Sequence, residues 1–218
     1  KFHGSDKKFM TPPPIFIPFI LIITSSLSLG AGYQLQERST SGLGRAFAGE
    51  AAIAEDASAI ATNASSLLLL EGTQFSTGFS YVAPDIKVTG TFNGSQTKDV
   101  GPAQSALIPY AHLSHRFTPD LAIGFSLHSR FGLSTDYSDS FSATSLANKS
   151  EITTHYLSPK IAYRINQCLS VGAGFDAVYV ESNLTNSISD GSPNLGGATI
   201  LDVEGDDWAY GFNLGSMF

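Results

Sequence analysis

The stretch Leu121-Ala-Ile-Gly-Phe-Ser-Leu-His128 alternates strictly between two kinds of side chain. Large apolar residues fill its odd positions, whereas Ala, Gly, Ser and His fill its even positions. Because successive residues of a β-strand point to opposite faces, this strand would have one apolar wall and one small or polar wall. The same period of two recurs at 75–81, 171–179 and 208–214. The sequence therefore predicts an all-β fold built of antiparallel strands.

The lengths of the connections distinguish between a membrane barrel and a soluble sandwich. Six strands are predicted, near 73–83, 106–117, 120–131, 152–164, 169–181 and 206–218. Two connections are tight, and the other three are long and polar, at 84–105, 132–151 and 182–205. Short turns that alternate with long loops are typical of an outer-membrane β-barrel, in which one rim faces the periplasm and the other faces outside. A barrel is therefore predicted.

The composition is consistent with this prediction. Charged residues make up only 14% of the chain, whereas soluble domains usually contain roughly 25%. A barrel wall needs apolar groups facing lipid and small or neutral groups facing the lumen, although a secreted β-sandwich shares this mixture. The net charge of −7, with no dense basic cluster, argues against nucleic acid as a partner. A single cysteine, Cys168, excludes an internal disulfide and a cysteine-based zinc site in this sequence.

The N-terminus has the order of a secretory signal peptide. Lys7 and Lys8 precede an apolar run at 15–23, and a polar segment then ends in Ser28-Leu29-Gly30. The apolar run is shorter than the roughly 20 residues that a membrane-spanning helix needs. We expect residues 1–30 to form a signal peptide that is cleaved after Gly30. Later apolar runs are shorter still, so the exported chain would cross a membrane as strands.

The segment after the expected cleavage site carries a specific resemblance. Residues 31–56 read AGYQLQERSTSGLGRAFAGEAAIAED. This string closely resembles the mature N-terminus of the FadL/TodX family, whose members transport long-chain fatty acids and other hydrophobic compounds across the bacterial outer membrane. The likeness continues through 81–90, 130–136 and 174–179, and it covers essentially all of 31–218.

The resemblance implies a fold and a function. Family members are fourteen-stranded outer-membrane β-barrels with an N-terminal hatch inside, so 31–72 would form the hatch and 73–218 about the first six strands. Six strands alone would form an open half-barrel with two unpaired edges. The implied function is transport of long-chain fatty acids by ligand-gated passive diffusion, with no enzymatic step and no cofactor. Outer-membrane lipid and the barrel-assembly machinery would be partners besides the hydrophobic ligand.

The resemblance also implies where the site lies. A kink in the third strand opens a lateral exit in family members, and here that region would be Phe125, Ser126, Leu127 and His128. The ligand-binding and hatch positions would be Arg38, Gly42, Gly44, Arg45, Glu50 and Asn63. The family's Asn-Pro-Ala sequence near the end of the hatch is Asn63-Ala64-Ser65 here. Without the proline that fixes φ, this turn is expected to be looser.

Basic residues are the candidates for holding a fatty-acid carboxylate. Arg38 and Arg45 would either pin the hatch through salt bridges, for example to Asp176, or contact the ligand, and the salt bridges are favoured. Lys160 and Arg164 are further basic candidates on the fourth strand. We expect the principal carboxylate partner to be a hatch arginine or a basic residue of strands that follow this chain.

Other functional classes have weaker support in the sequence. An apolar pocket discriminates poorly among hydrophobic ligands, so an aromatic hydrocarbon is an alternative substrate, and a structural or adhesin-like surface barrel is an alternative function. The sequence contains no G-x-S-x-G and no phosphate-binding glycine loop. His112 and His115 would point to opposite faces of a strand and so could not share a metal ion. The acids within 202–207 could bind Ca²⁺, but a solvated extracellular loop explains them better.

Overall fold

The computed structural model describes residues 34–138, 141, 143–144, 148–188 and 198–218, so the expected signal peptide lies outside it. Among the described residues, no helix combines the length and the apolarity needed to cross a membrane. The elements are a short α-helix, two 3-10 helices (η) and nine strands: α2 (Thr40–Gly44), η1 (Ala57–Ala61), η2 (Ala64–Leu69), β1 (Thr73–Val82), β2 (Lys87–Phe92), β3 (Ser95–Val100), β4 (Ala106–Thr118), β5 (Leu121–His128), β6 (Gly132–Asp136), β7 (Lys149–Arg164), β8 (Ser170–Ile188) and β9 (Ala198–Met217).

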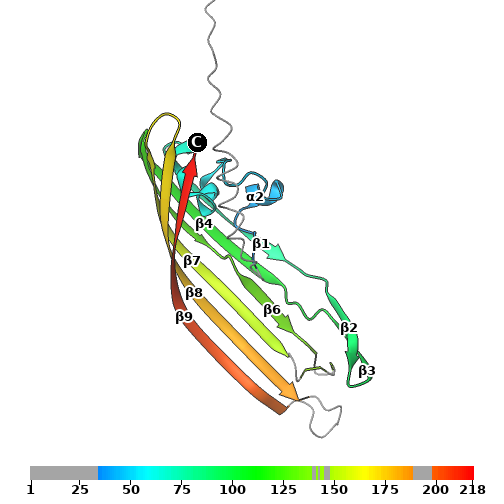
Figure 1. Cartoon of the computed structure of the whole chain (residues 1–218). Helices are drawn as coiled ribbons and strands as arrows, with labels where there is room; N and C mark the ends of the chain where they lie inside the picture. The colour runs from blue at the N-terminus through cyan, green and yellow to red at the C-terminus, as the bar shows by residue number, and fades with distance from the viewer. Residues whose placement is uncertain (1–33, 139–140, 142, 145–147, 189–197) are drawn as a thin grey trace, which may run out of the picture. The chain divides into compact units, whose positions relative to one another are not determined.

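Six strands form the wall of an antiparallel sheet in the order β1-β4-β5-β7-β8-β9 (Figure 1). The short strand β6 adds to β7, and β2 pairs with β3 as a separate hairpin. Within the described part of the chain, β1 and β9 each pair with one other strand, so the sheet is open at both edges. The predicted antiparallel all-β fold is confirmed, and so is the expected open half-barrel.

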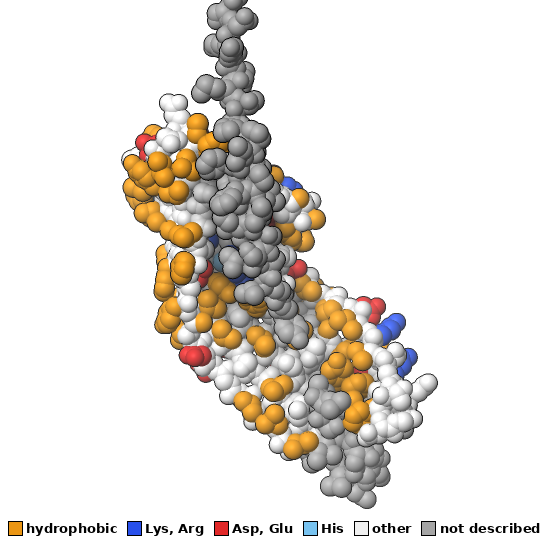
Figure 2. All heavy atoms as spheres, in the orientation of Figure 1, with side chains coloured by type: hydrophobic (Ala, Val, Ile, Leu, Met, Phe, Trp, Pro, Cys, Tyr) orange, Lys and Arg blue, Asp and Glu red, His pale blue; other side chains and the backbone are white. Residues whose placement is uncertain are grey.

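The two faces of the wall differ as the alternation predicts. On the outward face, Phe75 is 67% exposed and Phe212 is 80% exposed, and Figure 2 shows hydrophobic side chains along its left margin, over the outer strands β8 and β9. The inward face carries small and polar residues instead, including the fully buried Ser114, Ser126 and Ser158. An apolar surface of this extent is stable in a bilayer and unfavourable in water. The outward face therefore has the character of a lipid-facing wall.

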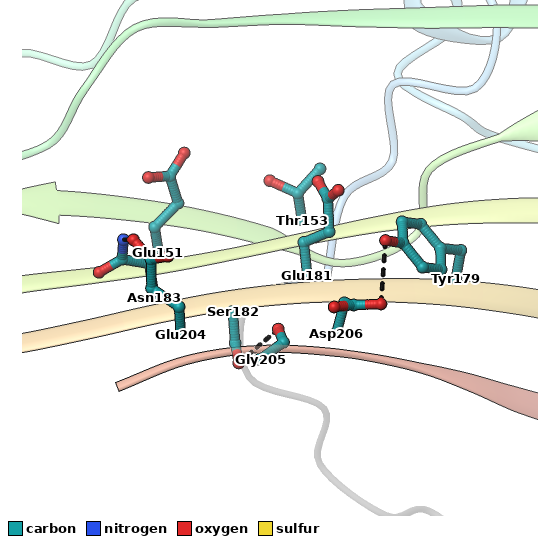
Figure 3. A pocket seen from close by; sticks show the side chains of 9 residues that line it. All are labelled: Glu151, Thr153, Tyr179, Glu181, Ser182, Asn183, Glu204, Gly205 and Asp206. Atoms are coloured by element: carbon teal, nitrogen blue, oxygen red, sulfur yellow. Dashed lines mark hydrogen bonds between the residues drawn. The ribbon is translucent and has the colours of Figure 1, made fainter. Parts of the chain in front are cut away.

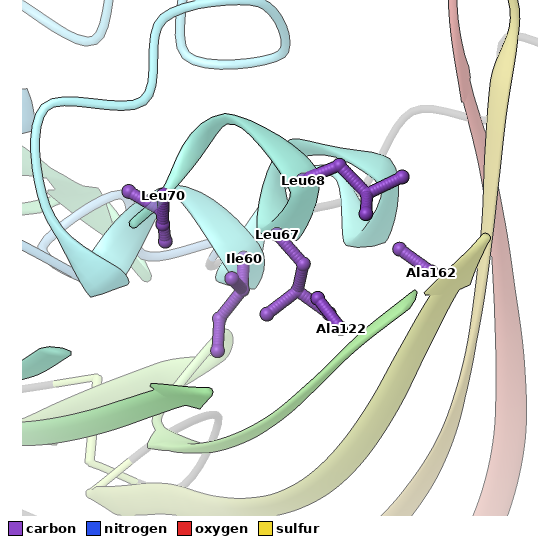
Figure 4. Close-up of a cluster of buried hydrophobic side chains, with 6 residues drawn as sticks. All are labelled: Ile60, Leu67, Leu68, Leu70, Ala122 and Ala162. Atoms are coloured by element: carbon purple, nitrogen blue, oxygen red, sulfur yellow. The ribbon is translucent and has the colours of Figure 1, made fainter. Parts of the chain in front are cut away.

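Residues 34–72, which we call the hatch segment, lie against the inward face. Ile60 and Leu67 of this segment are fully buried beside Ala122 of β5 and Ala162 of β7 (Figure 4). The alanines leave room for the larger side chains that approach them. Burial of each large aliphatic side chain contributes roughly 1.5–3 kcal/mol. Hydrophobic contact thus holds the hatch segment to the middle of the wall.

Segments predicted as long polar loops contain strands, and here the prediction was wrong. Segment 84–105 includes the β2–β3 hairpin, whose turn residues Asn93 and Gly94 have φ values of 49° and 81°. An Asn-Gly pair is the sequence signature of this turn. Segment 132–151 begins with β6, and segment 182–205 is mostly paired strand because β8 and β9 continue beyond their predicted ends. The outward positions of the β8 and β9 extensions are polar, and the aliphatic residues Val180, Leu184, Leu201 and Val203 lie at inward positions instead. A search for strands with an apolar outward face therefore passes over them.

Candidate functional site

Glycines of the wall bring the hatch segment into direct contact with the sheet. A Cβ atom at Gly172 of β8 would collide with the backbone of Ala64 and Ser65. A Cβ atom at Gly215 of β9 would collide with the side chain of Asn63. η2 and its N-cap residue Asn63 can pack closely against the wall at Gly172 and Gly215 because glycine has no side chain. Gly172 and Gly215 are therefore contact points for the hatch segment.

Replacing Gly172 with alanine in the full-length protein is expected to loosen the hatch segment. The added methyl group has to displace backbone atoms, and overpacking of this kind costs about 1–3 kcal/mol. Labelling of a cysteine placed at the fully buried Leu67 should become about fivefold faster or more. Gly211 is the matched control, because a Cβ there meets only the Cβ of Asp176, at 4.0 Å. Equal labelling rates in Gly172→Ala and Gly211→Ala would contradict this contact.

Asn63 joins the hatch segment to the last described strand. Its Oδ1 accepts hydrogen bonds from the backbone N of Ser65 at 3.0 Å and from the Ser65 Oγ at 2.7 Å, and so caps η2. Its Nδ2 donates to the Ala51 carbonyl at 2.7 Å and to the Ser216 carbonyl at 3.3 Å. These hydrogen bonds restrain the turn that lacks a proline. The side chain of Asn63 therefore has a structural role at the contact with β9.

Both hatch arginines form ion pairs inside the hatch segment. Arg38 is 6% exposed and donates to Glu50 at 2.9 Å, while Arg45 pairs with Glu55. Removing one partner of a buried pair leaves an uncompensated charge, which is strongly destabilising. Both arginines thus form salt bridges, but their acids belong to the hatch segment, so these pairs do not pin the hatch to a wall acid such as Asp176.

The two predicted hatch glycines differ in their surroundings. Gly42 is buried in α2, and a Cβ there would collide with the carboxylate of Glu50 and with Phe47. Gly44 has open space around its Cα. The structure thus brings Gly42 together with the Arg38–Glu50 pair and leaves Gly44 outside this cluster.

Asp56 is held in its charged form by the hatch segment. Its carboxylate accepts hydrogen bonds from the backbone N of Ser58 at 2.7 Å and from the Oγ of Ser41 at 2.8 Å. Burial acts to raise the pKa of Asp56, but the hydrogen bonds from Ser58 and Ser41 outweigh it, and the pKa lies below its ordinary value of 3.8. The charged carboxylate therefore stabilises the start of η1.

This lowered pKa predicts an acid-sensitive hatch segment. A carboxylate with a depressed folded-state pKa stabilises the fold above its unfolded-state pKa of about 3.9, and the stabilisation is lost as the pH falls through the folded-state value. We expect the hatch to open more often below about pH 4, and Asp56→Asn to remove this part of the pH dependence. Channel-opening frequency recorded from about pH 7 to about pH 3 measures the effect. An unchanged slope in the variant would exclude Asp56 as its source.

A chain of hydrogen bonds connects the third wall strand to the hatch segment. The Nε of Arg130 donates to the Nε2 of His128 at 3.1 Å, and the His128 Nδ1 lies 2.9 Å from the Oγ of Ser126. Ser126 lies 2.8 Å from the Nδ1 of His112, whose Nε2 lies 2.9 Å from the Arg38 carbonyl. A guanidinium only donates and a carbonyl only accepts, so the Nε2 of His128 accepts and the Nε2 of His112 donates. His128 is therefore neutral with its proton on Nδ1, and a neutral His112 with its proton on Nε2 completes the chain through the hydroxyl of Ser126.

The third wall strand is interrupted just after the residues predicted for its kink. Phe125, Ser126, Leu127 and His128 all pair regularly with β7. The interruption occupies 129–131, and β6 then resumes on β7 with its register shifted by one residue. The alternation ends here, because the neighbours His128 and Ser129 are both buried, at 4% and 7% exposure. The pairing of the third strand is therefore interrupted at 129–131, directly after the residues predicted for the kink.

Residues Gln34 and Leu35 of the hatch segment pair with the third strand at this interruption. Beyond Leu127 the third strand has no pairing with β4. In that place the backbone N of Leu35 donates to the Arg130 carbonyl at 2.7 Å, and Gln34 forms an isolated bridge with Phe131. The first described residues of the hatch segment thus pair with the strand at its break.

Basic residues of β7 also reach the hatch segment. Lys160 is 4% exposed, and its Nζ donates to the Ile60 carbonyl at 2.5 Å. Arg164 lies 3.5 Å from the Leu68 carbonyl and 3.9 Å from Asp120. Lys160 and Arg164, the basic candidates on the fourth strand, therefore lie on the inward face and contact the hatch segment.

An open depression lies on β7, β8 and β9, on the same strand face as the outward Phe175 (Figure 3). Its carboxylates are Glu151, Glu181, Glu204 and Asp206. The acids of 202–207 thus lie on the strand β9 and not in a loop, which corrects the prediction. In the part of the chain that the structure describes, no group of three or more His, Cys, Asp or Glu side chains is placed to hold a metal ion. The negative charge of this depression is unfavourable for binding a carboxylate.

Several site residues did not emerge from the sequence as a group. His112, Ser126, His128 and Tyr156 occupy inward positions that are cross-strand partners on neighbouring strands. Their shared position on the small and polar side of the alternation was a usable signal. The role of Arg130 carried no such signal, because it follows the last regular residue of β5.

Comparison with known proteins agrees with the fold. Residues 21–218 match the family described as outer membrane protein transport protein (OMPP1/FadL/TodX). The chain is 32% identical over 237 residues to the long-chain fatty acid transport protein of Escherichia coli O6:H1, which covers 98% of the chain and 52% of that protein. It is also 32% identical over 209 residues to the 47 kDa outer membrane protein of Pasteurella multocida, which covers 91% of the chain and 48% of that protein.

A solved structure shows the same fold. The crystal structure of a Pseudomonas aeruginosa FadL homologue superposes with a TM-score of 0.62 at 19% identity, over 85% of this chain and 49% of that one. The chain spans about half the length of the curated relatives it matches. The chain is an outer-membrane protein and belongs to the OMPP1/FadL/TodX family of outer-membrane transport proteins.

Proposed function

We propose that the whole protein carries long-chain fatty acids across the outer membrane by passive diffusion that the ligand itself gates. The observation that carries the proposal is that the hatch segment pairs with the third wall strand at its interruption, where the backbone N of Leu35 donates to the Arg130 carbonyl. A relative that spans almost the whole chain is named a long-chain fatty acid transport protein. Lateral release of an apolar molecule requires both a hatch that closes the lumen and a break in the wall.

The contacts of the hatch segment suggest how gating works. They combine a small apolar cluster with hydrogen bonds from wall residues to hatch carbonyls. A ligand that interacts better with the open arrangement shifts the population towards it, without any covalent step. The apolar outward face would then receive the released molecule into outer-membrane lipid. Insertion of such a wall would depend on the barrel-assembly machinery.

Uptake of labelled oleate by cells that express the full-length protein tests this function. The cells should lack their own transporter and should have normal fatty-acid activation, so that uptake reports passage through the outer membrane. Saturable oleate uptake that exceeds the empty-vector control is the expected result. Uptake of an aromatic hydrocarbon without uptake of oleate would assign the other substrate class. Absence of uptake of both compounds by a folded, surface-exposed protein would favour a structural or adhesin-like barrel.

A further inference from the structure

Two cations of the wall converge on one backbone carbonyl of the hatch segment. The Nη2 of Arg130 donates to the Ala61 carbonyl at 2.6 Å. The Nζ of Lys160 lies 3.4 Å from the same oxygen and donates to the neighbouring Ile60 carbonyl at 2.5 Å. The two side chains come from different places in the wall, the interruption after β5 and the middle of β7. They meet because the hatch segment presents Ile60 and Ala61 between them.

Neither of these cations has a carboxylate partner within salt-bridge distance among the described residues. Lys160 is 4% exposed, and the guanidinium of Arg130 stacks over the ring of Tyr156, 5.7 Å from its centroid. Charged groups removed from water are normally paired with an opposite charge or bound to a ligand. The neutral carbonyls of the hatch segment supply hydrogen bonds to these cations but no compensating charge.

The acids that face this pair are engaged elsewhere. Asp176 accepts hydrogen bonds from Ser158 at 2.5 Å and from Asn213 at 3.1 Å, and it attracts both cations over a longer distance. Glu50 is bound by Arg38 and Thr62. The pair thus retains donors that point towards the hatch segment, where only backbone oxygen meets them.

A hydrogen bond to His128 fixes the orientation of the Arg130 guanidinium. Its Nε donates to His128, which the histidine–serine chain connects to His112 and the hatch segment. This leaves the Nη groups for the side that faces Ala61. A guanidinium held in this way is suited to bidentate recognition of a carboxylate.

We propose that Arg130 and Lys160 form a carboxylate-binding site on the inward wall, which the Ala61 carbonyl occupies while the hatch is closed. The inference rests on the proposed function and names the residues that receive the fatty-acid head group. The head group replaces a neutral oxygen with a charged one at the same donors, which strengthens each hydrogen bond. The ligand carboxylate therefore takes the place of the Ala61 carbonyl, so binding of the ligand releases the hatch segment at Ala61. This exchange takes place beside the break in the third strand.

This site differs from the one expected from the sequence, which was a hatch arginine or a basic residue of later strands. Arg38 is committed to Glu50 and Arg45 to Glu55. Freeing either arginine for a ligand would leave its acid unpaired. When Lys160 and Arg130 bind the ligand instead of the hatch segment, the groups that lose their donor are neutral carbonyls and not carboxylates.

Binding of oleate and of oleyl alcohol to the full-length protein, reconstituted in detergent, tests the site. The two ligands share a tail, but only the acid carries a charge. Arg130→Gln and Lys160→Met should each weaken oleate binding about tenfold or more, with alcohol binding changed less than about twofold. Arg130→Lys and Lys160→Arg should restore most of the preference for the acid, because they keep the charge. Lys149→Gln is the matched control, since Lys149 lies on the same strand and pairs with Glu151 at 3.4 Å.

The outcomes separate the site from the proposed function. Heat-modifiable migration establishes that each variant is folded. If the parent protein binds both ligands and the variants bind oleate as it does, the carboxylate site is wrong and the transport function stands. Equal loss of acid and alcohol binding would also overturn the site, because a packing defect would explain it. A folded parent protein that binds neither ligand would overturn both the site and the proposed function.

Discussion

Deleting residues 31–72 from the full-length protein is expected to turn a closed barrel into an open pore. The hatch segment covers inward positions of β5, β7, β8 and β9, where the wall offers alanine and glycine. These small residues do not fill a lumen by themselves. A barrel well above eight strands has an interior wider than its own side chains can fill, so conductance should rise by about tenfold or more.

Single-channel recording in planar bilayers measures this effect. Deletion of the β2–β3 hairpin, 87–100, is a suitable control, because its strands pair with each other and not with the wall. The hairpin deletion should leave the resting conductance low. An unchanged conductance after removal of the hatch segment would mean that it does not close the lumen.

Placing a charge on the outward face is expected to have the second large effect, on assembly into the membrane. Phe125 is 37% exposed on the outward face and lies opposite Leu113 on one neighbouring strand and Pro159 on the other. An arginine on the lipid face near the middle of a bilayer costs about 2–4 kcal/mol. Phe125→Arg should therefore lower the free energy of unfolding in lipid vesicles by about this amount and reduce the folded fraction in the outer membrane.

The control for this substitution keeps the apolar character of the position. Phe125→Leu should fold and unfold nearly as the parent does, because leucine remains favourable in lipid. Denaturant titration of both variants in vesicles, followed by heat-modifiable migration, gives the comparison. Equal stability of the arginine and leucine variants would show that this face of the wall does not contact lipid.

The wall was predictable from the sequence because its signal is local. Alternation of apolar and small residues gives each strand its two faces, and each wall strand pairs with the next wall strand in sequence. The errors fall where that signal ends. The paired extensions of β8 and β9 are polar on the outward face, where the other wall segments are apolar, and the break at 129–131 appears only as two consecutive buried residues.

The site was less predictable because its contacts are distant in sequence and involve the backbone. Lys160 meets the Ile60 carbonyl, 100 residues away, and any residue type offers a carbonyl. The family resemblance pointed to Arg38 and Glu50, which do form a pair. It gave no indication that Arg130 and Lys160 converge, since that depends on how the hatch segment seats against the wall.

Locking the hatch segment to the wall with a disulfide tests most directly the claim that it must move for a ligand to pass. The Cγ of Asn63 lies 3.1 Å from the position of a Cβ atom at residue 215. A cysteine sulfur and the Cβ of its disulfide partner are separated by about 3 Å, so Asn63→Cys with Gly215→Cys can form the bond. Cys168 is free and exposed, so the pair is made in a Cys168→Ser background.

Oxidation of the double-cysteine protein is expected to abolish oleate uptake, and reduction is expected to restore it. Each single-cysteine protein should transport oleate equally under both conditions. Formation of the bond is followed by mass spectrometry of the peptide pair, so that uptake is compared at a known degree of locking. Unchanged uptake by a fully locked protein would contradict the account, because ligand would then pass without movement of the hatch segment at β9.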